Sequence, residues 1–367
     1  MQKETEPHIS TNRTSPILCA GEPDEHFFAT NPLEHPEWDS LLPLNDLCSV
    51  FHSSRWARVL QDSYGHKPVY FCRQSPGELR QLLPVMEISG PLGGRHGISL
   101  PFTDVCLPLG DSESVRHLYG AAMEYGRAHD WRYFEYRGGN GERPGAVPSL
   151  EYWGHYVDLD SSEEALFARL KVATRRGVRK AQRAQLGIEF SSQTDAMEGF
   201  YRLHCATRRR HGVPPQPWLF FENILRLVIQ PGHGFVVTAS LEKKPIAAAV
   251  FFHFGFEAVY KFGASDYNFQ HLRGNNLVLW EAIKRYSANG FSRLHLGRTS
   301  LANKGLRRFK LGFGAMEEKI RYFKYDFRKQ AFVGGVDHSN LWFKPVFRHL
   351  PLPLLRWLGA MAYPRLA

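Results

Sequence analysis

The stretch from Gly263 to Gly314 constrains the fold more than any other part of the chain. It contains the end of an apolar strand, a polar loop with a glycine, an amphipathic helix, a second short strand and a basic, aromatic loop. That order places a helix N-terminus and a group of cations close together at strand ends. Helix N-termini bind anions because their first backbone N–H groups lack partners and the helix dipole is positive there.

The polar loop of this stretch supplies the groups that an anion site needs. Arg273 is a permanent cation, and Gly274 lets a ligand approach the backbone closely. Asn275 or Asn276 can cap the helix that follows. We therefore expect a phosphate-bearing donor to bind at His271, Arg273, Gly274, Asn275 and Asn276.

The composition of the chain predicts a folded protein with anionic partners. The 367 residues are 43% hydrophobic and 13% aromatic, which is enough for a substantial core in two domains. The formal net charge of +10 suits nucleic acid, phosphorylated metabolites or an acidic membrane face. The five cysteines form no C-x-x-C pair and no metal-ligand spacing, so we expect reduced thiols, no metal and a cytoplasmic location.

Two further absences bear on location. The N-terminus has no long apolar segment, so a secretory signal is not expected. No run of about 18 apolar residues occurs, so no membrane span is expected either.

The order of predicted elements indicates an α/β (α+β) protein built from two similar units. The first half ends in M-E-Y-G-R-A-H-D-W-R-Y-F-E-Y-R and the second in A-I-K-R-Y-S-A-N-G-F-S-R-L-H-L, each a helix followed by a strand. We expect each unit to be a mixed sheet flanked by helices. The expected divisions are a disordered tail over 1–25, an N-terminal domain over 26–148, a catalytic C-terminal domain over 149–330 and an amphipathic tail over 331–367.

A strongly basic helix is predicted after a capping box at Ser161 and Glu164. Seven lysines and arginines fall between residues 169 and 183, and those four residues apart share one helix face. Like charges at that spacing repel each other, which is hard to explain unless an anion lies against them. Arg175, Arg176 and Arg179 are therefore candidates for substrate binding.

The C-terminal segment over 347–365 differs in character from the rest of the chain. A helix from Leu354 would carry Leu354, Leu358 and Met361 on one side, with Arg356 away from them. Such a helix suits the interface of a membrane. A helix that packs on its own domain explains the pattern equally well, so both interpretations stay open.

The chain lacks the standard catalytic signatures. It has no G-x-x-x-x-G-K-[ST] loop, no G-x-S-x-G elbow and no H-E-x-x-H motif. What remains is the basic run Arg307-Arg308-Phe309-Lys310 between glycines. A lysine held by a rigid aromatic residue can stabilise the oxyanion that develops in acyl transfer, whereas the alternative is a solvated basic turn.

Several segments resemble the FemABX-type aminoacyltransferases of the GNAT superfamily. In the second half these are K-P-I-A-A-A-V-F-F-H, Y-K-F-G-A-S, G-N-N-L-V-L-W-E-A-I and G-L-R-R-F-K-L-G-F-G. The basic segment K-V-A-T-R-R-G-V-R-K-A-Q-R is similar to the family's R-R-x-x-x-K-A pattern, and F-H-S-S-R-W and S-L-P-F-T-D resemble first-half segments. The resemblance covers most of residues 45–325.

The resemblance implies two tandem GNAT-like domains that transfer an acyl group to an amine. It places Phe309 and Lys310 at the reaction centre, with Lys310 stabilising the tetrahedral oxyanion. The family's pyrophosphate loop reads Q/R-x-x-G-x-G/A, whereas this chain has H-L-R-G-N-N, so the first and last positions depart from it. Members use aminoacyl-tRNA to modify lipid-linked cell-wall precursors, which implies a donor that is acyl-CoA or aminoacyl-tRNA and no permanently bound cofactor.

The leading hypothesis is an N-acyltransferase that forms an amide on an amine of a cell-envelope precursor, related to peptidoglycan or polysaccharide. Asp104 could act as a base or orient the nucleophile, although an aspartate that caps a turn is the alternative. The remaining expected substrate contacts are Lys261, Arg298 and Arg307. The expected partners are the anionic donor, a lipid-linked or glycan acceptor and the inner face of the membrane, but not DNA.

Two other interpretations remain. One is a non-catalytic RNA- or membrane-binding protein that uses the basic helix over 169–183, although that helix lacks the interleaved aromatic residues that stack on bases. The other is a degenerate GNAT protein that binds a nucleotide without catalysis.

Overall fold

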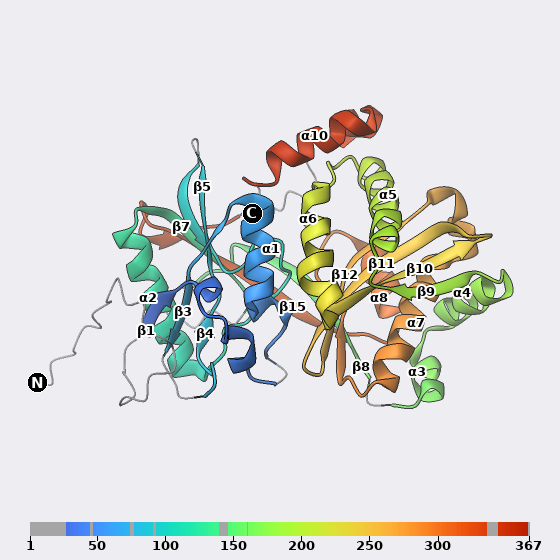
Figure 1. Ribbon diagram of the computed structural model, residues 1–367, viewed down its shortest axis with the longest axis horizontal. Helices are drawn as coiled ribbons and strands as arrows, with labels where there is room; N and C mark the ends of the chain where they lie inside the picture. The colour runs from blue at the N-terminus through green and yellow to red at the C-terminus, as the bar shows by residue number, and fades with distance from the viewer. Residues whose placement is uncertain are drawn as a thin grey trace, which may run out of the picture.

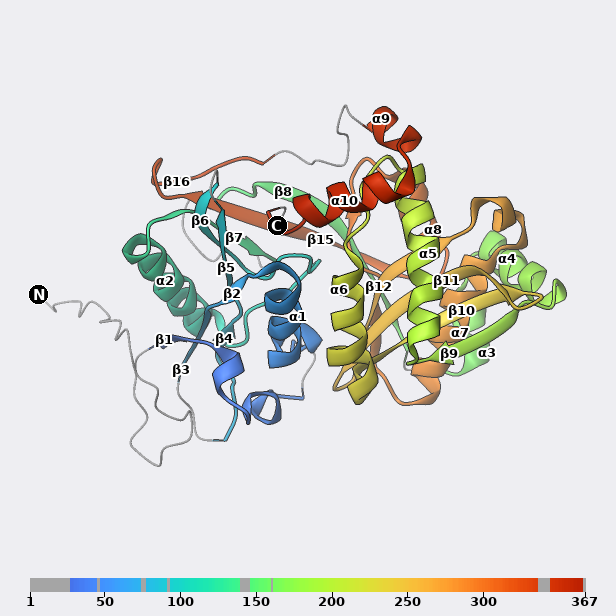
Figure 2. The same cartoon turned by 45° about the horizontal axis from the view of Figure 1, so that its top comes forward.

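The computed structural model describes residues 27–44, 47–73, 77–90, 93–138, 146–159, 161–335 and 344–365. The chain forms two lobes connected by long strands (Figures 1 and 2). The disordered tail expected over 1–25 lies outside the described residues, as do parts of the loops at the predicted domain boundary.

The first lobe combines two long helices with short strands. Its elements are β1 (Phe27–Thr30), the 3₁₀ turns Pro32–Glu34, Trp38–Leu41 and Val50–His52, α1 (Ser54–Tyr64), β2 (Lys67–Pro68), β3 (Tyr70–Arg73), β4 (Leu82–Leu83), β5 (Met86–Gly90), β6 (Gly94–Ile98), α2 (Ser112–Ala128) and β7 (Trp131–Arg137). The sequence predicted α1 correctly: the Ser53 side chain accepts a hydrogen bond from the Trp56 amide and caps the helix. Trp56, Val59 and Leu60 are buried together on one face of α1.

The second lobe contains longer strands between helices. Its elements are β8 (Leu150–Asp158), α3 (Glu163–Arg169), α4 (Val172–Arg183), β9 (Gly187–Ser191), α5 (Thr194–Arg210), α6 (Trp218–Ile224), a π-helical turn (Leu225–His233), β10 (Gly234–Leu241), β11 (Lys244–Phe254), β12 (Glu257–Ser265), a 3₁₀ turn (Tyr267–Leu272), α7 (Gly274–Ala288), β13 (Arg293–His295), β14 (Thr299–Ser300), α8 (Lys304–Leu311), β15 (Met316–Asp326) and β16 (Ala331–Phe332). Helices α4 and α7 cover one face of the sheet, and α5 and α6 cover the other.

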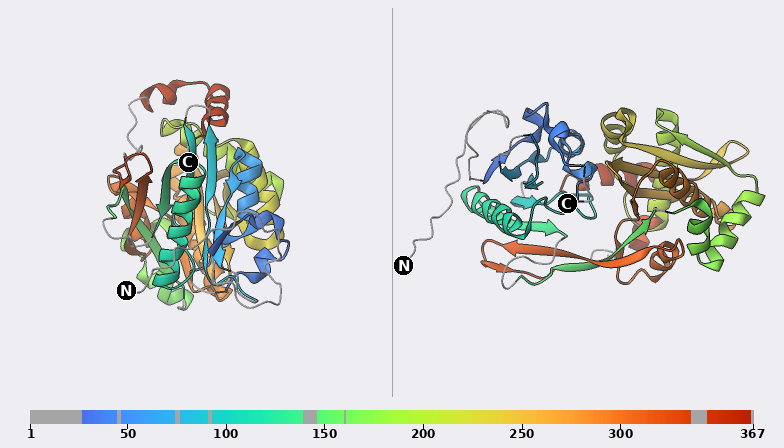
Figure 3. Two further views of the ribbon diagram at one scale, coloured as in Figure 1. Left: turned by 90° about the vertical axis from the view of Figure 1, so that its left-hand side faces the viewer. Right: turned by 90° about the horizontal axis from the view of Figure 1, so that it is seen from below.

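One large sheet runs through both lobes. Among the described residues its strand order is β2-β5-β6-β7-β15-β8-β13-β12-β11-β10-β9, and β1-β3-β4 form a separate small sheet. The first part of β15 pairs with β8 and its last part pairs with β7, so one strand connects the two lobes. Figure 3 shows β8 and β15 extending along one side of the molecule from lobe to lobe. The α/β class expected from the sequence is confirmed, whereas the domain boundary near 148 stays a prediction.

Two local predictions were wrong. The basic segment is two helices, because Ser162, and not Ser161, caps α3 and the chain is extended at Leu170 and Lys171 before α4 begins. The basic run that ends in Lys310 is the helix α8 and not a loop. The Asn303 side chain caps this helix by accepting a hydrogen bond from the Leu306 amide at 3.0 Å.

The C-terminal segment packs on its own protein and also presents an apolar face to solvent. It forms α9 (Lys344–His349) and α10 (Leu352–Ala362), and α10 lies across the ends of α5 and α6 (Figure 2). Leu355 and Gly359 of α10 are buried against the second lobe, whereas Leu354, Trp357 and Met361 are exposed. In the described part of the chain, no helix has both the length and the apolar character that crossing a bilayer requires.

The two lobes share a hydrophobic core. Helix α1 packs against α6, and the ring of Trp56 lies 5.1 Å from that of Phe51, 6.1 Å from that of Phe220 and 5.7 Å from that of Phe252, between ring centroids. Trp56 and Phe51 belong to the first lobe, and Phe220 and Phe252 belong to the second. This aromatic cluster therefore fixes the orientation of the lobes.

We predict that Trp56→Ala lowers the free energy of unfolding by about 3–5 kcal/mol, because it leaves a large cavity at a fully buried position. Urea denaturation followed by circular dichroism measures this change. The matched control is Trp357→Ala, at a position 57% exposed, for which we expect a change within about 0.5 kcal/mol. Equal effects of the two substitutions would contradict the shared core.

Candidate active site

The site lies where two neighbouring strands of the large sheet separate. β12 and β13 run parallel and pair only through Glu257–Val259 and Arg293–His295. Beyond these three pairs β12 continues to Ser265, paired with β11 on its other side only. Strands that part in this way leave backbone N–H and C=O groups of one strand edge open to a ligand.

A β-bulge at Lys261 aims its side chain at the first lobe. Tyr260 pairs with Phe251 and Phe262 pairs with Val250, so Lys261 is the extra residue in β12. Its ammonium lies 3.8 Å from the carboxylate of Asp104 and 5.5 Å from the centre of the Phe51 ring. The bulge thus brings a cation of the second lobe against a carboxylate of the first.

Asp104 is at the centre of a group of cations from the second lobe. Besides Lys261, the guanidinium of Arg298 lies 3.5 Å from its carboxylate. The hydroxyl of Tyr322 donates a hydrogen bond of 2.7 Å to the Asp104 backbone carbonyl and accepts one of 2.9 Å from Arg298. Gly297 adopts φ +71°, and a Cβ at this position would lie 2.6 Å from the Asp104 carboxylate. Only glycine fits this close approach.

Lys310 completes the group from α8. Its ammonium donates hydrogen bonds of 2.8 Å to the carbonyl of Gly297 and 3.0 Å to that of Arg298, and the residue is 3% exposed. A protonated ammonium has three N–H groups, so one remains beyond the two hydrogen bonds that the described residues accept. We refer to Asp104, Lys261, Arg298 and Lys310 as the ion cluster.

The electrostatics of the ion cluster keep Asp104 charged and make Lys310 easy to deprotonate. Burial alone would raise the pKa of Asp104, but Lys261, Arg298 and Lys310 together lower it below its ordinary value. Burial lowers the pKa of Lys310 to about 8, with Asp104 opposing the shift and the two other cations adding to it. A carboxylate with a lowered pKa is a poor base, so this geometry favours an orienting role for Asp104.

A small cavity of about 100 Å³ opens beside the ion cluster, between the lobes. Its wall includes Asp104 and Gly297 together with a histidine–carboxylate pair that the sequence analysis missed. In that pair, His295 Nε2 lies 3.3 Å from an oxygen of Glu257, whose side chain is only 4% exposed. Such a pair can accept the proton that an attacking amine releases.

A second histidine–carboxylate pair lies next to the first. His155 Nε2 is 3.1 Å from Glu317, and its Nδ1 is buried without a hydrogen-bond partner among the described residues. Burial and the charge of Lys310 lower the pKa of His155, although Glu317 opposes this shift. Arg307 forms two hydrogen bonds of 2.7 Å with the same Glu317 and lies over the Trp153 ring. Arg307 therefore orients a carboxylate and does not face the cavity directly.

Not every expected residue enters the site. The ring of Phe309 packs on Phe313 at 5.3 Å and contributes to the apolar core of the second lobe, so the adjacent Lys310 alone points into the ion cluster. On α4, Arg176 and Arg179 are exposed and Arg175 is half-buried. The arginines of α4 thus form a surface near the site and not a part of its centre.

The anion loop expected at 271–276 lies at the far end of β12. Ser265 is four residues beyond Lys261, which corresponds to about 13 Å along a strand. Neither asparagine caps α7, because Arg273 occupies the N-cap position in the left-handed conformation and the Asn275 side chain instead donates to the Ser265 hydroxyl at 3.0 Å. Gly274 is buried against Ala247, with no room for a larger side chain.

Helix α4 connects the anion loop with α8. Its Gly177 packs against Asn276 of the loop, and its Thr174, one turn earlier, packs against Gly312 at the end of α8. Because residues three apart share a helix face, the loop and the Lys310 helix flank the same side of α4. A ligand that extends from the anion loop to the ion cluster would pass the parted edge of β12.

The sequence carried signals for some of the residues that were missed. A glycine just after a strand, as at Gly297, indicates a close approach of the backbone, and it precedes Arg298, which was among the expected contacts. No local signal identifies Glu257 and His295 as a pair, because they lie on different strands and meet only through the parallel pairing of β12 and β13.

Comparison with known proteins gives a family for part of the chain. Residues 168–319 match the family model of the acetyltransferase (GNAT) domain. No curated protein matches the sequence.

Solved structures extend the likeness to most of the chain. The structure of FemX superposes with a TM-score of 0.62 at 14% identity, covering 81% of this chain and 96% of FemX. L-PGS from Bacillus licheniformis superposes with a TM-score of 0.52 at 11% identity, covering 85% of this chain and 92% of L-PGS. The C-terminal domain of a putative lysylphosphatidylglycerol synthetase from Agrobacterium fabrum superposes with a TM-score of 0.51 at 16% identity, covering 72% of this chain and 85% of that domain. These likenesses show that the chain shares the fold of FemX over most of its length, and the GNAT domain match lies in its second lobe.

We predict that Gly297→Ala destabilises the protein more than Gly290→Ala. Gly297 has φ +71° and Gly290 has φ +75°, so both substitutions add backbone strain of about 1–2 kcal/mol. At Gly290 nothing lies within 4 Å of the added carbon, whereas at Gly297 it meets the Asp104 carboxylate. Urea denaturation of the two variants isolates the contribution of the Asp104 contact. Equal free energies of unfolding would show that Asp104 is not held against Gly297.

Proposed function

We propose that the chain, whose residues 168–319 match the model of the acetyltransferase (GNAT) domain, is an acyltransferase that forms an amide on an amine of a cell-envelope precursor. The observation that carries this proposal is the buried ammonium of Lys310, fixed on two backbone carbonyls where β12 and β13 part. A rigid cation in a site sheltered from water stabilises negative charge that develops on an acyl oxygen.

The chemistry assigned to the site is one substitution at an acyl carbon. The amine nitrogen of the acceptor attacks this carbon, and its carbonyl oxygen becomes an oxyanion beside the free N–H of Lys310. His295, supported by Glu257, takes the proton that the nitrogen loses. The carbonyl re-forms as the bond between the acyl carbon and the sulfur or oxygen of the donor breaks, and that atom takes up the proton that His295 then releases.

The proposed donor is acyl-CoA or aminoacyl-tRNA. Both carry phosphates, and the anion loop at the end of β12 together with Arg175, Arg176 and Arg179 offers cations to them. The distance of about 13 Å from Ser265 to Lys261 leaves room for an extended arm between phosphate and acyl group.

The proposed acceptor is a peptidoglycan- or polysaccharide-related amine, lipid-linked or glycan-borne. The FemABX-like fold, found also in the similar domain of a putative lysylphosphatidylglycerol synthetase, supports an envelope substrate. The exposed apolar residues of α10 support a peripheral contact of segment 347–365 with the inner face of the membrane. Such an enzyme would work in the cytoplasm.

A ligand that binds the native state raises the midpoint of thermal unfolding, so the donor can be found without knowing the acceptor. We expect acetyl-CoA or aminoacyl-tRNA, tested in parallel with free CoA, to raise the midpoint. Arg273→Ala should abolish the shift, whereas Arg127→Ala on the exposed surface of α2 should not. A shift with CoA species alone would identify an ordinary acyl-CoA enzyme, and one with aminoacyl-tRNA alone would favour the Fem-type reaction. The absence of any shift would argue against both donors.

Once a donor and acceptor pair is known, Lys310→Ala should lower kcat by about 10²–10³, because it removes an oxyanion donor. The wild-type kcat should fall as the pH rises through about 8, since Lys310 loses its charge there. In Lys310→Arg this alkaline decline should disappear, because arginine stays protonated. A normal turnover number in Lys310→Ala would refute the assignment.

Two companion variants separate the remaining roles. His295→Gln should lower kcat while KM stays unchanged, because it removes a proton acceptor and no binding group. If Lys310 proves dispensable while Arg175, Arg176 and Arg179 are required for binding RNA or vesicles, the basic helix defines a non-catalytic binding protein instead.

A further inference from the structure

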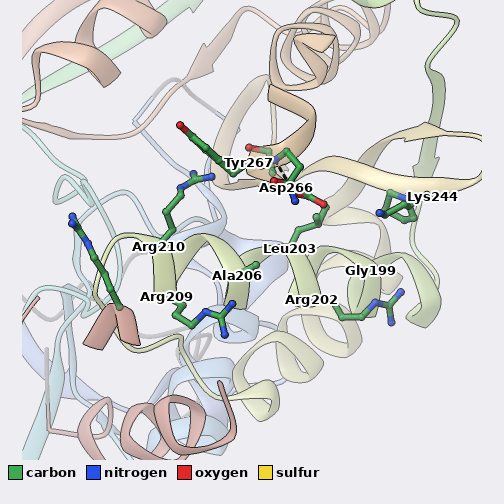
Figure 4. Close-up of a pocket in the computed structure, with 13 residues that line it drawn as sticks. Gly199, Arg202, Leu203, Ala206, Arg209, Arg210, Lys244, Asp266 and Tyr267 are labelled. Carbon is green, nitrogen blue, oxygen red and sulfur yellow. Dashed lines mark hydrogen bonds between the residues drawn. The ribbon is translucent and has the colours of Figure 1, made fainter. Parts of the chain in front are cut away.

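A basic groove lies outside the candidate active site, on the face of the sheet that α5 covers (Figure 4). It has a volume of about 580 Å³ and an apolar floor made by Leu203 and Pro245. One face of α5 forms one wall, and the start of β11 with the loop after β12 forms the other. Five cations line it: Arg202, Arg209, Arg210, Lys244 and Arg348.

The positive charge of this groove is poorly compensated. Arg209 and Arg348 have no carboxylate partner among the described residues, and Arg210 lies over the ring of Tyr267 at 5.2 Å. The carboxylate in the wall, Asp266, accepts a hydrogen bond from the Asn268 amide at 3.0 Å, and none of the five cations forms an ion pair with it. Arg202 reaches Glu198 only at 4.0 Å, and both side chains are exposed.

Guanidinium groups gathered around a groove suit a phosphate, because they bind its oxygens through paired N–H groups. The seven-residue spacing of Arg202 and Arg209 brings both to one face of α5, and Lys244 faces them from the other wall. The floor and the ring of Tyr267 add apolar surface, which an inorganic ion does not use.

The groove is bordered by the first of the two C-terminal helices. Arg348 belongs to α9, which leads directly into α10, and both helices contact α5. On α10, Leu354, Trp357 and Met361 are 43%, 57% and 48% exposed, and their spacing places them on one side of the helix. From residue 344 to the end the sequence has no aspartate or glutamate.

This apolar face is a fixed part of the surface. The Tyr363 hydroxyl donates to the carbonyl of Pro214 at 3.0 Å and accepts from Arg208 at 2.6 Å. Gly359 packs against the backbone of Pro215, where a larger residue would collide. Because the buried side of α10 is held in this way, the exposed side is presented permanently to a partner.

We propose that the groove binds the phosphate head group of an anionic phospholipid while α10 inserts its exposed apolar residues into the same leaflet. A phospholipid combines the two features found side by side here, a phosphate and an apolar chain, whereas RNA supplies only the first. The inference deepens the envelope function proposed above and rests on it, because it brings the enzyme to the surface where a lipid-linked acceptor lies.

Sedimentation with vesicles tests the proposal independently of transfer activity. The full chain should bind phosphatidylcholine vesicles that contain phosphatidylglycerol, and not vesicles of phosphatidylcholine alone. The double variant Arg202→Glu, Arg209→Glu should lose at least about 25-fold in affinity, since each surface cation contributes about fivefold. Trp357→Ala should weaken binding as well, because it removes an inserted ring.

The matched control is the double variant Arg116→Glu, Arg127→Glu, which reverses the charge of two exposed arginines of the first lobe. It should bind the vesicles as the wild type does. Equal losses in both double variants would show that only net charge matters and would overturn the proposal. Retained vesicle binding with lost tRNA binding in the groove variant would make the groove an RNA site. Lys310→Ala should bind vesicles normally, so failure of the transfer reaction and failure of the lipid site are distinguishable.

Discussion

The contact of Asp104 with Lys261, Arg298 and Lys310 is the interaction on which the rest of the structure depends. The Asp104 carboxylate of the first lobe is 26% exposed and lies 3.8 Å from Lys261 and 3.5 Å from Arg298 of the second, and the charge of Lys310 helps to lower its pKa. Buried charges are costly unless they are paired and hydrogen-bonded, so the lobes must be closely joined for the cluster to exist. Because one negative charge compensates only part of the three positive ones, the site stays electropositive, which suits the oxyanion of our proposal.

The sheet and the aromatic core hold the lobes in the geometry that the ion cluster needs. β15 pairs with β8 and with β7, so it passes from one lobe into the other without a flexible linker. On the opposite side, Trp56 of α1 packs among Phe51, Phe220 and Phe252. The bulge at Lys261 and the glycine at 297 are small backbone features. They can position the charged groups of the ion cluster because the strands on one side and the aromatic core on the other hold the two lobes in place.

The positive charge of the chain is divided between two surfaces with different tasks in our proposal. Helix α4 and the anion loop lie on the face of the sheet shared with α7 and α8, and lead toward Lys310. The groove of α5 lies on the other face, beside α9 and α10. A donor on one face and a membrane on the other would leave the cavity between the lobes open to the acceptor.

The sequence by itself determined the α/β class, the GNAT-like second half and the α1 helix, and it directed the search for a site to the stretch that contains Lys310. The class and the helix follow from local patterns, namely apolar periodicity and a serine cap, whereas the GNAT-like second half follows from the resemblance of several segments to a known family. It did not reveal the contact of Glu257 with His295, the close approach of Gly297 to Asp104, or the separation of Phe309 from the ion cluster. The tertiary structure decided these contacts. Parallel strand pairing, a bulge and the joining of the lobes bring together residues that are far apart in the sequence, and no local sequence pattern around either residue indicates the other.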